Sequence, residues 1–259
     1  MSEFDPRRVQ QALVCMLFDP KYAARVRGRE PLPELGERER ELLRGVDPRA
    51  LATDEMRRAR ALHVILDEYP VSAALLGIDG VDRFFSSPGF RACVFERGSM
   101  ALGFGEGWLR DRTKGVGAIE TGLARARREL LAASAEASEG IRRAPGVIPL
   151  RVPDGTLAWY RRARERLGAE PLQALTKLRK PWPQKPPRRG QQHLLIEPQA
   201  DGSLGIATAS AALVELLEAG SKARPRAELA KLAIELGAEP HEADELLDEL
   251  LGDKLLCDR

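Results

Sequence analysis

Hydrophobic residues recur at helical spacing through the first half of the chain, and several of these runs begin at an acidic or hydroxyl residue followed by proline. Such a pair favours a helix start, because the first side chain can cap the helix and proline is tolerated in its first turn. The four pairs are Asp5-Pro6, Asp19-Pro20, Asp47-Pro48 and Ser87-Pro88. Apolar residues then follow at helical spacing, as over 9–17 and 54–66. With further helices predicted after Ser99 and over 119–138, the pattern indicates a helical domain at 1–145.

The hydrophobic pattern changes near residue 147. Residues 147–152 are apolar and partly β-branched, and they end at Pro153-Asp154-Gly155, which predicts a short strand leading into a helix over 157–167. Residues 181–190 contain four prolines and no apolar periodicity, which is typical of an extended, semi-rigid linker. The segment 146–190 is therefore predicted to hold a strand, a basic helix and a proline-rich linker.

Two apolar, partly β-branched runs follow the linker, at 193–197 and 203–207, and the Asp201-Gly202 pair between them predicts a β-hairpin. Three helical patterns come next, starting at about 210, 226 and 239, and Gly220 and Gly237 end the first two. A hairpin with three short helices predicts a winged-helix-like domain at 191–259. The fold class predicted for the whole chain is α+β, mostly α.

Charge is balanced overall but unevenly distributed. The chain has 41 basic and 39 acidic residues, so its formal net charge of +2 favours neither nucleic acid nor membrane as a partner. Residues 161–190 hold ten basic and two acidic residues, whereas 227–258 hold ten acidic and two basic ones. The two segments therefore carry opposite charge.

Membrane insertion and secretion are not indicated by the sequence. The longest apolar stretches, such as 62–66, are far shorter than the roughly 20 residues that a membrane-spanning helix needs. The N-terminus carries acidic residues and no apolar signal-peptide core, so a cytoplasmic location is expected. Cys15, Cys93 and Cys257 are widely separated and include no C-x-x-C pair, which favours reduced, unreactive thiols.

Residues for catalysis or cofactor binding are not clustered in the sequence. His63, His193 and His241 lie far apart, and none begins an H-E-x-x-H motif, so no metal site is expected. The glycine-rich run 103–107 lacks the Lys-Ser/Thr pair of a phosphate-binding loop, and a tight turn is the interpretation that it favours. No G-x-S-x-G motif occurs. The chain is therefore expected to have no catalytic residue, no metal and no cofactor.

The third helical pattern of the last domain distinguishes between DNA and a peptide as the ligand. A winged helix that binds DNA places this helix in the major groove and needs basic residues on it. Residues 239–250 contain no Lys or Arg and would repel a phosphate backbone. A peptide that adds as a strand to the hairpin edge fits this composition better.

The basic segment leaves two interpretations open. Trp182 lies among Lys180, Lys185, Arg188 and Arg189, where it could stack on a nucleobase while the cations contact phosphate. The favoured interpretation is a solvated linker whose Trp182 packs on a neighbouring lobe. The arginines at 161, 162, 164 and 166 could likewise form a simple exposed helix face or meet an acidic partner.

Several segments of the last domain resemble a known family. They are Leu194-Leu195-Ile196, Asp201-Gly202, the run 211–220, Ala227-Glu228-Leu229, and the run 245–251 followed by Lys254-Leu255-Leu256. Over residues 191–257 the chain resembles the PqqD-like RiPP recognition element. Members of this family bind leader sequences of ribosomally made, post-translationally modified peptides, which implies the same role here. The family usually begins with an additional strand, which here would have to be residues 147–152 or be missing.

The first domain resembles a second group. Its motifs are Phe84-Phe85-Ser86-Ser87-Pro88-x-Phe90, Gly98-Ser99-Met100-Ala101-Leu102-Gly103-Phe104 and the run 149–157. These residues resemble the partner subunits of multinuclear non-heme iron-dependent oxidases, a group that includes the methanobactin partner protein. The resemblance implies that an oxidase carries the iron and that this chain presents a precursor peptide to it, often for modification at cysteine.

We therefore expect a non-catalytic partner that captures a leader peptide through 191–259 and docks on the oxidase through its helical domain. The predicted peptide-binding residues are Leu204, Gly205, Ile206, Ala207, Thr208 and Leu247. Gly205 would permit close approach of the leader, and Glu245 or Glu249 could pair with a basic leader residue. Proline at Ile206 is expected to weaken leader binding, and arginine at Lys185 to change it little. The alternative function is a winged-helix nucleic-acid-binding regulator that uses the basic segment 161–189.

Overall fold

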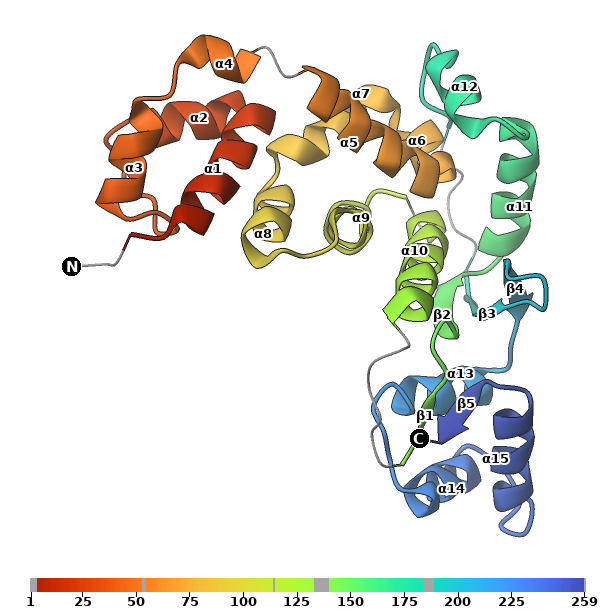
Figure 1. Cartoon of the computed structure of the whole chain (residues 1–259). Coiled ribbons are helices and arrows are strands. Elements are labelled where there is room, and N and C mark those ends of the chain that lie inside the picture. The colour runs from red at the N-terminus through yellow and green to blue at the C-terminus, as the bar shows by residue number, and fades with distance from the viewer. Residues whose placement is uncertain (1–3, 53–54, 114, 133–139, 184–188, 259) are drawn as a thin grey trace. The chain divides into compact units, whose positions relative to one another are not determined.

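A computed structural model describes residues 4–52, 55–113, 115–132, 140–183 and 189–258 of the chain (Figure 1). Over these residues the protein is mostly helical, with one three-stranded and one two-stranded antiparallel sheet. The predicted α+β, mostly α class is confirmed. The chain forms two compact units: unit 1 contains Met1–Thr113 and Arg161–Lys185, and unit 2 contains Lys114–Tyr160 and Pro186–Arg259.

These units divide the chain at other points than the predicted boundaries after residues 145 and 190. The helix at 116–132 packs on the three-stranded sheet, so it belongs to unit 2 although it lies within the predicted helical domain. The helix at 171–176 packs on helices of unit 1, which assigns the basic segment to that unit. Each unit is thus built from two segments that are separate in the sequence.

All the regular secondary-structure elements of unit 1, in the part that the structure describes, are helices. Its elements are α1 (Pro6–Phe18), α2 (Pro20–Arg27), α3 (Glu37–Arg44), α4 (Pro48–Ala52), α5 (Glu55–Glu68), α6 (Pro70–Leu76), α7 (Ile78–Asp82), η1 (Arg83–Ser86), α8 (Pro88–Glu96), α9 (Met100–Gly103), η2 (Phe104–Trp108), the last part of α11 (Thr156–Leu167), and α12 (Pro171–Thr176). The helix predicted over 157–167 is confirmed as α11, whereas α12 has no counterpart in the prediction.

The predicted helix starts before proline are confirmed. Asp5, Asp19 and Asp47 each accept a hydrogen bond from the backbone N–H two residues later, at 2.9, 3.0 and 2.8 Å. The hydroxyl of Ser87 accepts one from the N–H of Phe90 at 3.2 Å. Because the first N–H groups of a helix have no partner within the helix, each such cap contributes about 1 kcal/mol to stability.

An aromatic cluster fills the middle of unit 1. Phe18, Phe84, Phe85, Phe90 and Phe104 are buried, and their neighbouring ring centroids lie 5.0 to 5.7 Å apart. Tilted and edge-to-face aromatic pairs attract one another at these distances. The phenylalanines of the sequence motif at 84–90 therefore have a structural role in the core.

The glycine-rich run at 103–107 is helical, so the predicted tight turn is wrong. Helix α9 continues directly into the π-helical turn η2. Phe104 is fully buried, and a Cβ atom on Gly103 would overlap the sulfur of Cys93 on α8. Gly103 is therefore explained by the close approach of two helices rather than by a turn.

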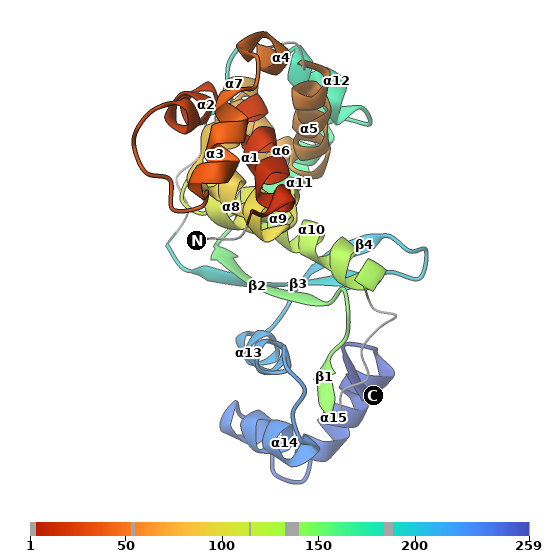
Figure 2. The same ribbon diagram turned by 60° about the vertical axis from the view of Figure 1, so that its left-hand side comes forward.

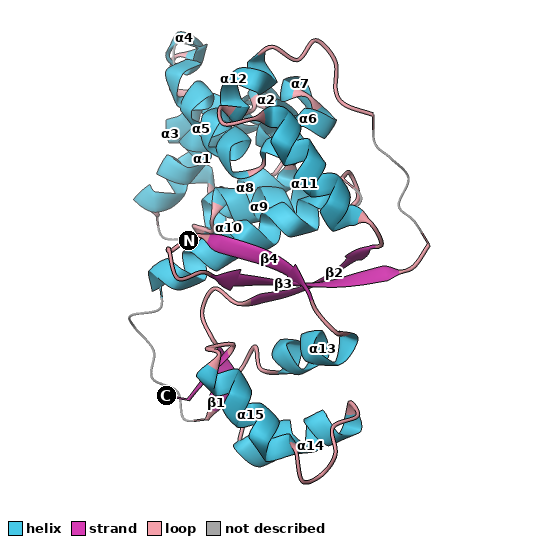
Figure 3. Cartoon of the chain, turned by 90° about the vertical axis from the view of Figure 1, so that its right-hand side faces the viewer, coloured by secondary structure: helices cyan, strands magenta, loops and turns pink. Residues whose placement is uncertain are grey.

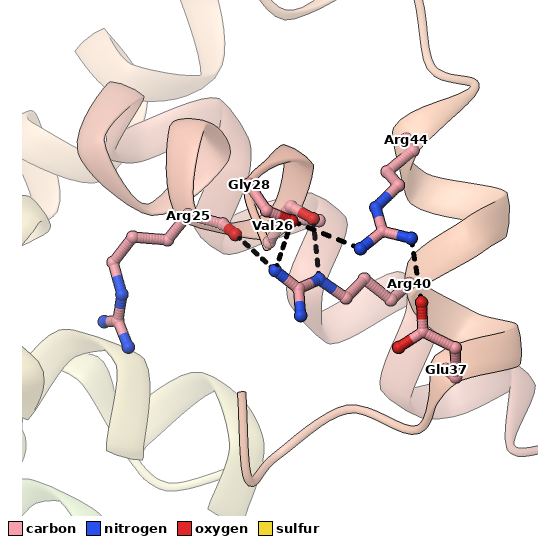
Figure 4. Close-up of polar contacts among 6 residues, drawn as sticks. All are labelled: Arg25, Val26, Gly28, Glu37, Arg40 and Arg44. Carbon is pink, nitrogen blue, oxygen red and sulfur yellow. Dashed lines mark hydrogen bonds and ion pairs between the residues drawn. The ribbon is translucent and has the colours of Figure 1, made fainter. Parts of the chain in front are cut away.

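A buried arginine joins the end of α2 to α3 (Figure 4). Arg40 is 4% exposed, and its guanidinium donates hydrogen bonds to the carbonyl oxygens of Val26, Arg25 and Gly28 at 2.9, 2.9 and 2.6 Å. Arg44 adds a further donor to the carbonyl of Gly28 at 3.2 Å. Since the last carbonyls of a helix have no donor within it, these two side chains complete the C-terminal end of α2.

The segment that follows α12 lies against α6. The N–H of Trp182 donates to the carbonyl oxygen of Ala74 at 2.8 Å, and the residue is only 9% exposed. The guanidinium of Arg166 lies over the indole, 4.6 Å from the ring centroid. The prediction that Trp182 packs on the protein is confirmed, while residues 184–188 of the predicted linker lie outside the described residues.

Unit 2 contains a three-stranded sheet with a helix on each face (Figures 2 and 3). Strands β2 (Ile148–Pro153), β3 (Gln191–Pro198) and β4 (Leu204–Thr208) are antiparallel in the order β2-β3-β4. Ile196 packs with Ala126 of α10 (Val116–Ala132), whereas the preceding residue, Leu195, packs with Leu217 of α13 (Ala211–Ala219). The predicted strand at 147–152 and the predicted hairpin are both confirmed.

The remaining elements of unit 2 share one core. Helices α14 (Arg226–Glu235) and α15 (Ala243–Gly252) pack with α13, and β1 (Ile141–Arg143) pairs with β5 (Leu256–Asp258). The three predicted helices are confirmed. The third begins at Ala243, a few residues later than predicted, because the residues after Gly237 form turns.

Candidate peptide-binding edge

Strand β4 lies at an edge of the three-stranded sheet. It pairs with β3 from Leu194↔Thr208 to Pro198↔Leu204, and no other strand in the described part of the chain pairs with it. Five of the six predicted peptide-binding residues, those at 204–208, are therefore brought together on one edge strand. Unpaired backbone groups of such a strand can receive an added strand.

Two hydrogen bonds at the ends of the hairpin fix the direction of the backbone groups. The N–H of Ala209 donates to the carbonyl of His193 at 3.0 Å, and the N–H of Gln199 donates to the carbonyl of Ser203 at 2.8 Å. Hydrogen-bonded pairs alternate along an antiparallel ladder. The odd-numbered residues of β4 therefore bond to β3, and the even-numbered residues point their backbone groups away from it.

The outward-facing backbone groups of β4 belong to Leu204, Ile206 and Thr208. Ile206 already has an interaction partner in the structure, so a substitution there would change that interaction as well as any contact with a peptide. Leu204 and Thr208 therefore provide the backbone donors and acceptors that a peptide strand would meet. Gly205 and Ala207 point inward and hold the hairpin together.

The side chains of β4 differ in exposure. Leu204 and Ile206 are half-buried and pack toward the α10 side of the sheet, whereas Ala207 and Thr208 are exposed. A Cβ atom on Gly205 would overlap the side-chain amide of Gln199, so that amide already occupies the space beside the glycine. The group that approaches Gly205 closely is therefore Gln199 of the hairpin turn, whereas the prediction assigned this close approach to the leader peptide.

Leu247, the sixth predicted residue, does not offer a surface for a peptide. Its side chain is fully buried in the core that α13, α14 and α15 share, together with Leu217 and Leu229. The leucines of α15 that retain some exposure are Leu246 and Leu251. Leu247 therefore supports the core, and contact with a leader side chain would require this core to open.

Acidic side chains cover the exposed surface of α15, but they are not equivalent. Arg226 of α14 bonds to Asp244 at 2.9 Å and to Asp248 at 2.8 Å. The hydrogen bond from Arg226 lowers the pKa of Asp248 below its ordinary value. Glu245 and Glu249 are exposed and form no ion pair among the described residues. These two glutamates are therefore the acids of α15 that remain available to a basic ligand.

Reactive groups are not concentrated at this edge or elsewhere in the described ranges. Cys15, Cys93 and Cys257 form no disulfide, and burial raises the pKa of the Cys15 thiol to about 12. No group of three or more potential metal ligands occurs among residues 4–52, 55–113, 115–132, 140–183 and 189–258. None of the helices described has the length and apolar character to span a membrane.

Helix α10 is the part of the candidate site that the sequence pattern did not assign to it. It covers the face of the sheet opposite α13, and Gly122 lies where it meets the sheet. A Cβ atom on Gly122 would lie 2.7 Å from Ile196 and 3.0 Å from Leu150. A glycine inside a long amphipathic helix was the available signal for such close packing.

Comparisons with known proteins give no match: no family model matches this chain, and a search of curated proteins finds none similar to it.

Proposed function

We propose that the chain is a non-catalytic, cytoplasmic partner protein that binds the leader of a ribosomally synthesised precursor peptide and presents that peptide to an iron-dependent oxidase. The observation that carries the proposal is the edge strand β4, whose backbone groups at Leu204 and Thr208 point away from the sheet. A peptide that adds as a strand gains affinity from these main-chain groups. Iron and redox chemistry belong to the oxidase, and this chain supplies binding.

The order of elements supports a recognition element of the PqqD-like type. Three antiparallel strands, β2, β3 and β4, are followed by the three helices α13, α14 and α15. The additional strand that this family usually has corresponds to β2, which pairs with β3 along its whole length. In this proposal the unit is a winged-helix-like module, and its sheet edge serves peptide rather than DNA.

The charge of α15 supports a peptide ligand. Its exposed side chains include Glu245 and Glu249, which form no ion pair among the residues described. A basic leader residue could pair with either, although an exposed pair contributes only about 0 to 1 kcal/mol. A DNA phosphate would instead be repelled by the same surface. Acidic residues therefore act in the selection of ligand more than in affinity.

Unit 1 is the part proposed to dock on the oxidase. Two large apolar side chains of α5, Met56 and Val64, are 65% and 46% exposed, and Leu42 of α3 is 56% exposed. Apolar side chains of this size would be removed from water by a docked protein. Association is tested by co-purification with any multinuclear non-heme iron-dependent oxidase that is encoded near the gene for this chain. Retained association after deletion of 1–113 would contradict docking through this unit.

Leader binding is tested by a matched pair of proline variants in β4. Thr208→Pro removes a backbone donor that points away from β3, so the protein should fold while its affinity for the leader falls by about fivefold or more. Ala207→Pro removes a donor that bonds to β3, so it should destabilise the hairpin itself. Titration of a fluorescently labelled leader from any precursor-peptide gene found near the gene for this chain, with circular dichroism as the folding control, measures both effects. Unchanged affinity of a folded Thr208→Pro protein would place the leader elsewhere.

The alternative function, a nucleic-acid-binding regulator, has lost one of its two supporting observations. Trp182 is buried under Arg166 and is not open to stack on a base. The other observation stands, because Arg162 and Arg164 are exposed on α11. A salt-dependent shift of duplex DNA by the purified chain, without any binding of the leader, would favour the regulator.

A further inference from the structure

A cavity with a basic rim lies within unit 1, separate from the edge strand of unit 2. It has a volume of about 380 Å³ and is formed by the end of α6, by α7 and by the segment that runs from α12 to Pro181. Helix α12 packs on both α5 and α6. A space of this size can hold one or two amino-acid side chains of a ligand. We call it the basic cavity.

Aliphatic side chains form much of the lining of the basic cavity. Leu76 and Ile78 contribute from the junction of α6 and α7, and Leu175 and Leu178 contribute from α12 and the residues after it. Leu175 is almost fully buried, whereas the other three are half-buried. The half-buried aliphatic surface would be removed from water by an apolar group of a ligand.

Three cations surround this aliphatic lining. Arg83, Arg179 and Lys180 all line the basic cavity and are exposed, and none of them forms an ion pair within the described ranges. Asp79 is the one acidic residue among the lining residues. The cavity therefore carries an excess of positive charge that no side chain in the described part of the protein neutralises.

The segment that supplies two of these cations is held in place by its neighbours. A Cβ atom on Gly77, which has a positive φ of 72°, would lie 3.0 Å from the ring of Pro181. The backbone N–H of Trp182 donates to the carbonyl of Ala74, which lies on α6 about one turn before Gly77. Residues 179 and 180 are thus anchored on their C-terminal side, so the cavity exists before a ligand binds. Preformed sites lose less entropy on binding than sites that must be assembled.

We propose that the basic cavity binds a short acidic peptide segment, with one aliphatic side chain against the lining and carboxylates on both sides of it at the cationic rim. An inorganic anion would use the cations but leave the aliphatic lining in water. A neutral apolar ligand would leave the cations without partners. An apolar residue flanked by Asp or Glu uses both features, which is the argument from charge and shape complementarity.

The proposal does not rest on leader binding at β4, because the basic cavity and β4 belong to different units. The two ideas can therefore fail separately. The Thr208→Pro variant should bind an acidic peptide as well as the unaltered protein does. The cavity variants should conversely leave affinity for the leader at β4 unchanged.

The test is fluorescence anisotropy of the full-length chain with the labelled, acetylated peptide Asp-Glu-Leu-Glu-Asp at low salt. Arg83→Gln, Arg179→Gln and Lys180→Gln are exposed changes, and each should weaken binding by up to about fivefold. The triple variant should weaken it by about tenfold or more, with affinity also falling as salt rises. Arg38→Gln on α3, an exposed arginine of the same unit outside the cavity, is the matched control and should bind as before.

Changes in the peptide test the aliphatic lining without altering the protein. Glycine in place of the peptide's leucine should weaken binding by about tenfold, since the buried apolar side chain is lost. Lysine in place of its acids should abolish binding. Equal binding of the leucine and glycine peptides, or full displacement by equimolar inorganic phosphate, would show a general anion site and overturn the proposal.

Further outcomes of two kinds would also overturn it. One is unchanged affinity of the triple variant, or no binding of the acidic peptide to the unaltered chain. The other is self-association: the acidic helices α14 and α15 of a second copy offer similar chemistry. Sedimentation velocity that shows a concentration-dependent dimer, lost in the triple variant, would identify a second copy as the occupant.

Discussion

At the scale of single residues, Arg40 provides the sharpest test of the structure. Its guanidinium bonds to three carbonyl oxygens at the end of α2, and the residue is 4% exposed. Arg40→Met keeps much of the aliphatic stem but removes the donor to the carbonyl of Val26 and one of two donors to those of Arg25 and Gly28, so we expect a loss of about 2 kcal/mol in unfolding free energy. Urea denaturation followed by circular dichroism measures it.

The control for Arg40 is its neighbour Arg44, which also bonds to Gly28. The Arg44 side chain is 33% exposed and its second partner, Glu37, is exposed, so water can replace both contacts. Arg44→Met should therefore cost less than about 1 kcal/mol. Equal effects of the two substitutions would contradict the capping role of Arg40.

Cys15 predicts a dependence of stability on pH. Burial raises its pKa from 9.0 to about 12, although the nearby charge of Arg91 opposes the shift. The thiol stays protonated in the folded protein at pH values where the unfolded chain ionises. Its stabilising contribution is therefore complete below pH 9 and is lost as the pH rises toward 12. At pH 10 the loss of unfolding free energy amounts to about 1 kcal/mol. Unfolding free energies at pH 8 and pH 10 should fall further apart in the unaltered protein than in Cys15→Ala.

Single residues also show where sequence reasoning reaches its limit. The capping residues Asp5, Asp19 and Ser87 could be predicted because a cap acts on its own first turn. Leu247 could not be placed, because Leu246 and Leu247 are chemically identical neighbours in a leucine-rich helix. Only the packing of α15 against α13 and α14 decides that Leu247 is buried and Leu246 is not.

At the scale of elements, Gly122 decides how closely α10 approaches the sheet. Gly122→Val would push a branched side chain into Ile196 and Leu150, and overpacking of this kind costs about 1 to 3 kcal/mol. Gly252→Ala at the end of α15 meets no atom within 4 Å and should be neutral or slightly stabilising. Thermal unfolding of both variants provides the comparison. A stable Gly122→Val protein would show that α10 can move away from the sheet without cost.

The elements themselves were largely predictable, but their partners were not. The periodicity of residues 119–131 indicates a helix with one apolar face, and the structure has α10 there. That face could have packed on other helices or on a sheet, since periodicity describes one element and says nothing about what covers it. The strand at 147–152 posed the same problem, which its pairing with β3 resolves. The free edge of β4 follows from this pairing, so the candidate site depended on information that the hairpin sequence lacks.

At the scale of the whole molecule, the interleaved segments of the two units explain why the predicted boundaries after 145 and 190 differ from the structural ones. Contrasts in composition marked the proline-rich segment at 181–190 as a boundary. Trp182 instead joins α6 of unit 1 through a backbone hydrogen bond. The chain leaves unit 1 after Thr113 and returns to it at Arg161. A composition change reports where the chain is extended, whereas a domain boundary depends on which residues share a core.

This organisation predicts how truncation affects unit 2. A chain of residues 115–259 keeps α10 over Ile148 and Ile196, whereas a chain of residues 141–259 leaves these two core residues without the helix that covers them. Both chains lack residues 1–113 and keep the 161–185 segment of unit 1, so the loss of that unit's larger segment affects them equally, and they differ only in residues 115–140, which include α10. We expect the longer chain to give a dispersed amide NMR spectrum. The shorter one should bind a hydrophobic dye and aggregate, because the exposed face of a sheet of this size favours association. Equal stability and equal dye binding of the two chains would show that the sheet and α13–α15 fold without α10, and unit 2 would then be smaller than its contacts indicate.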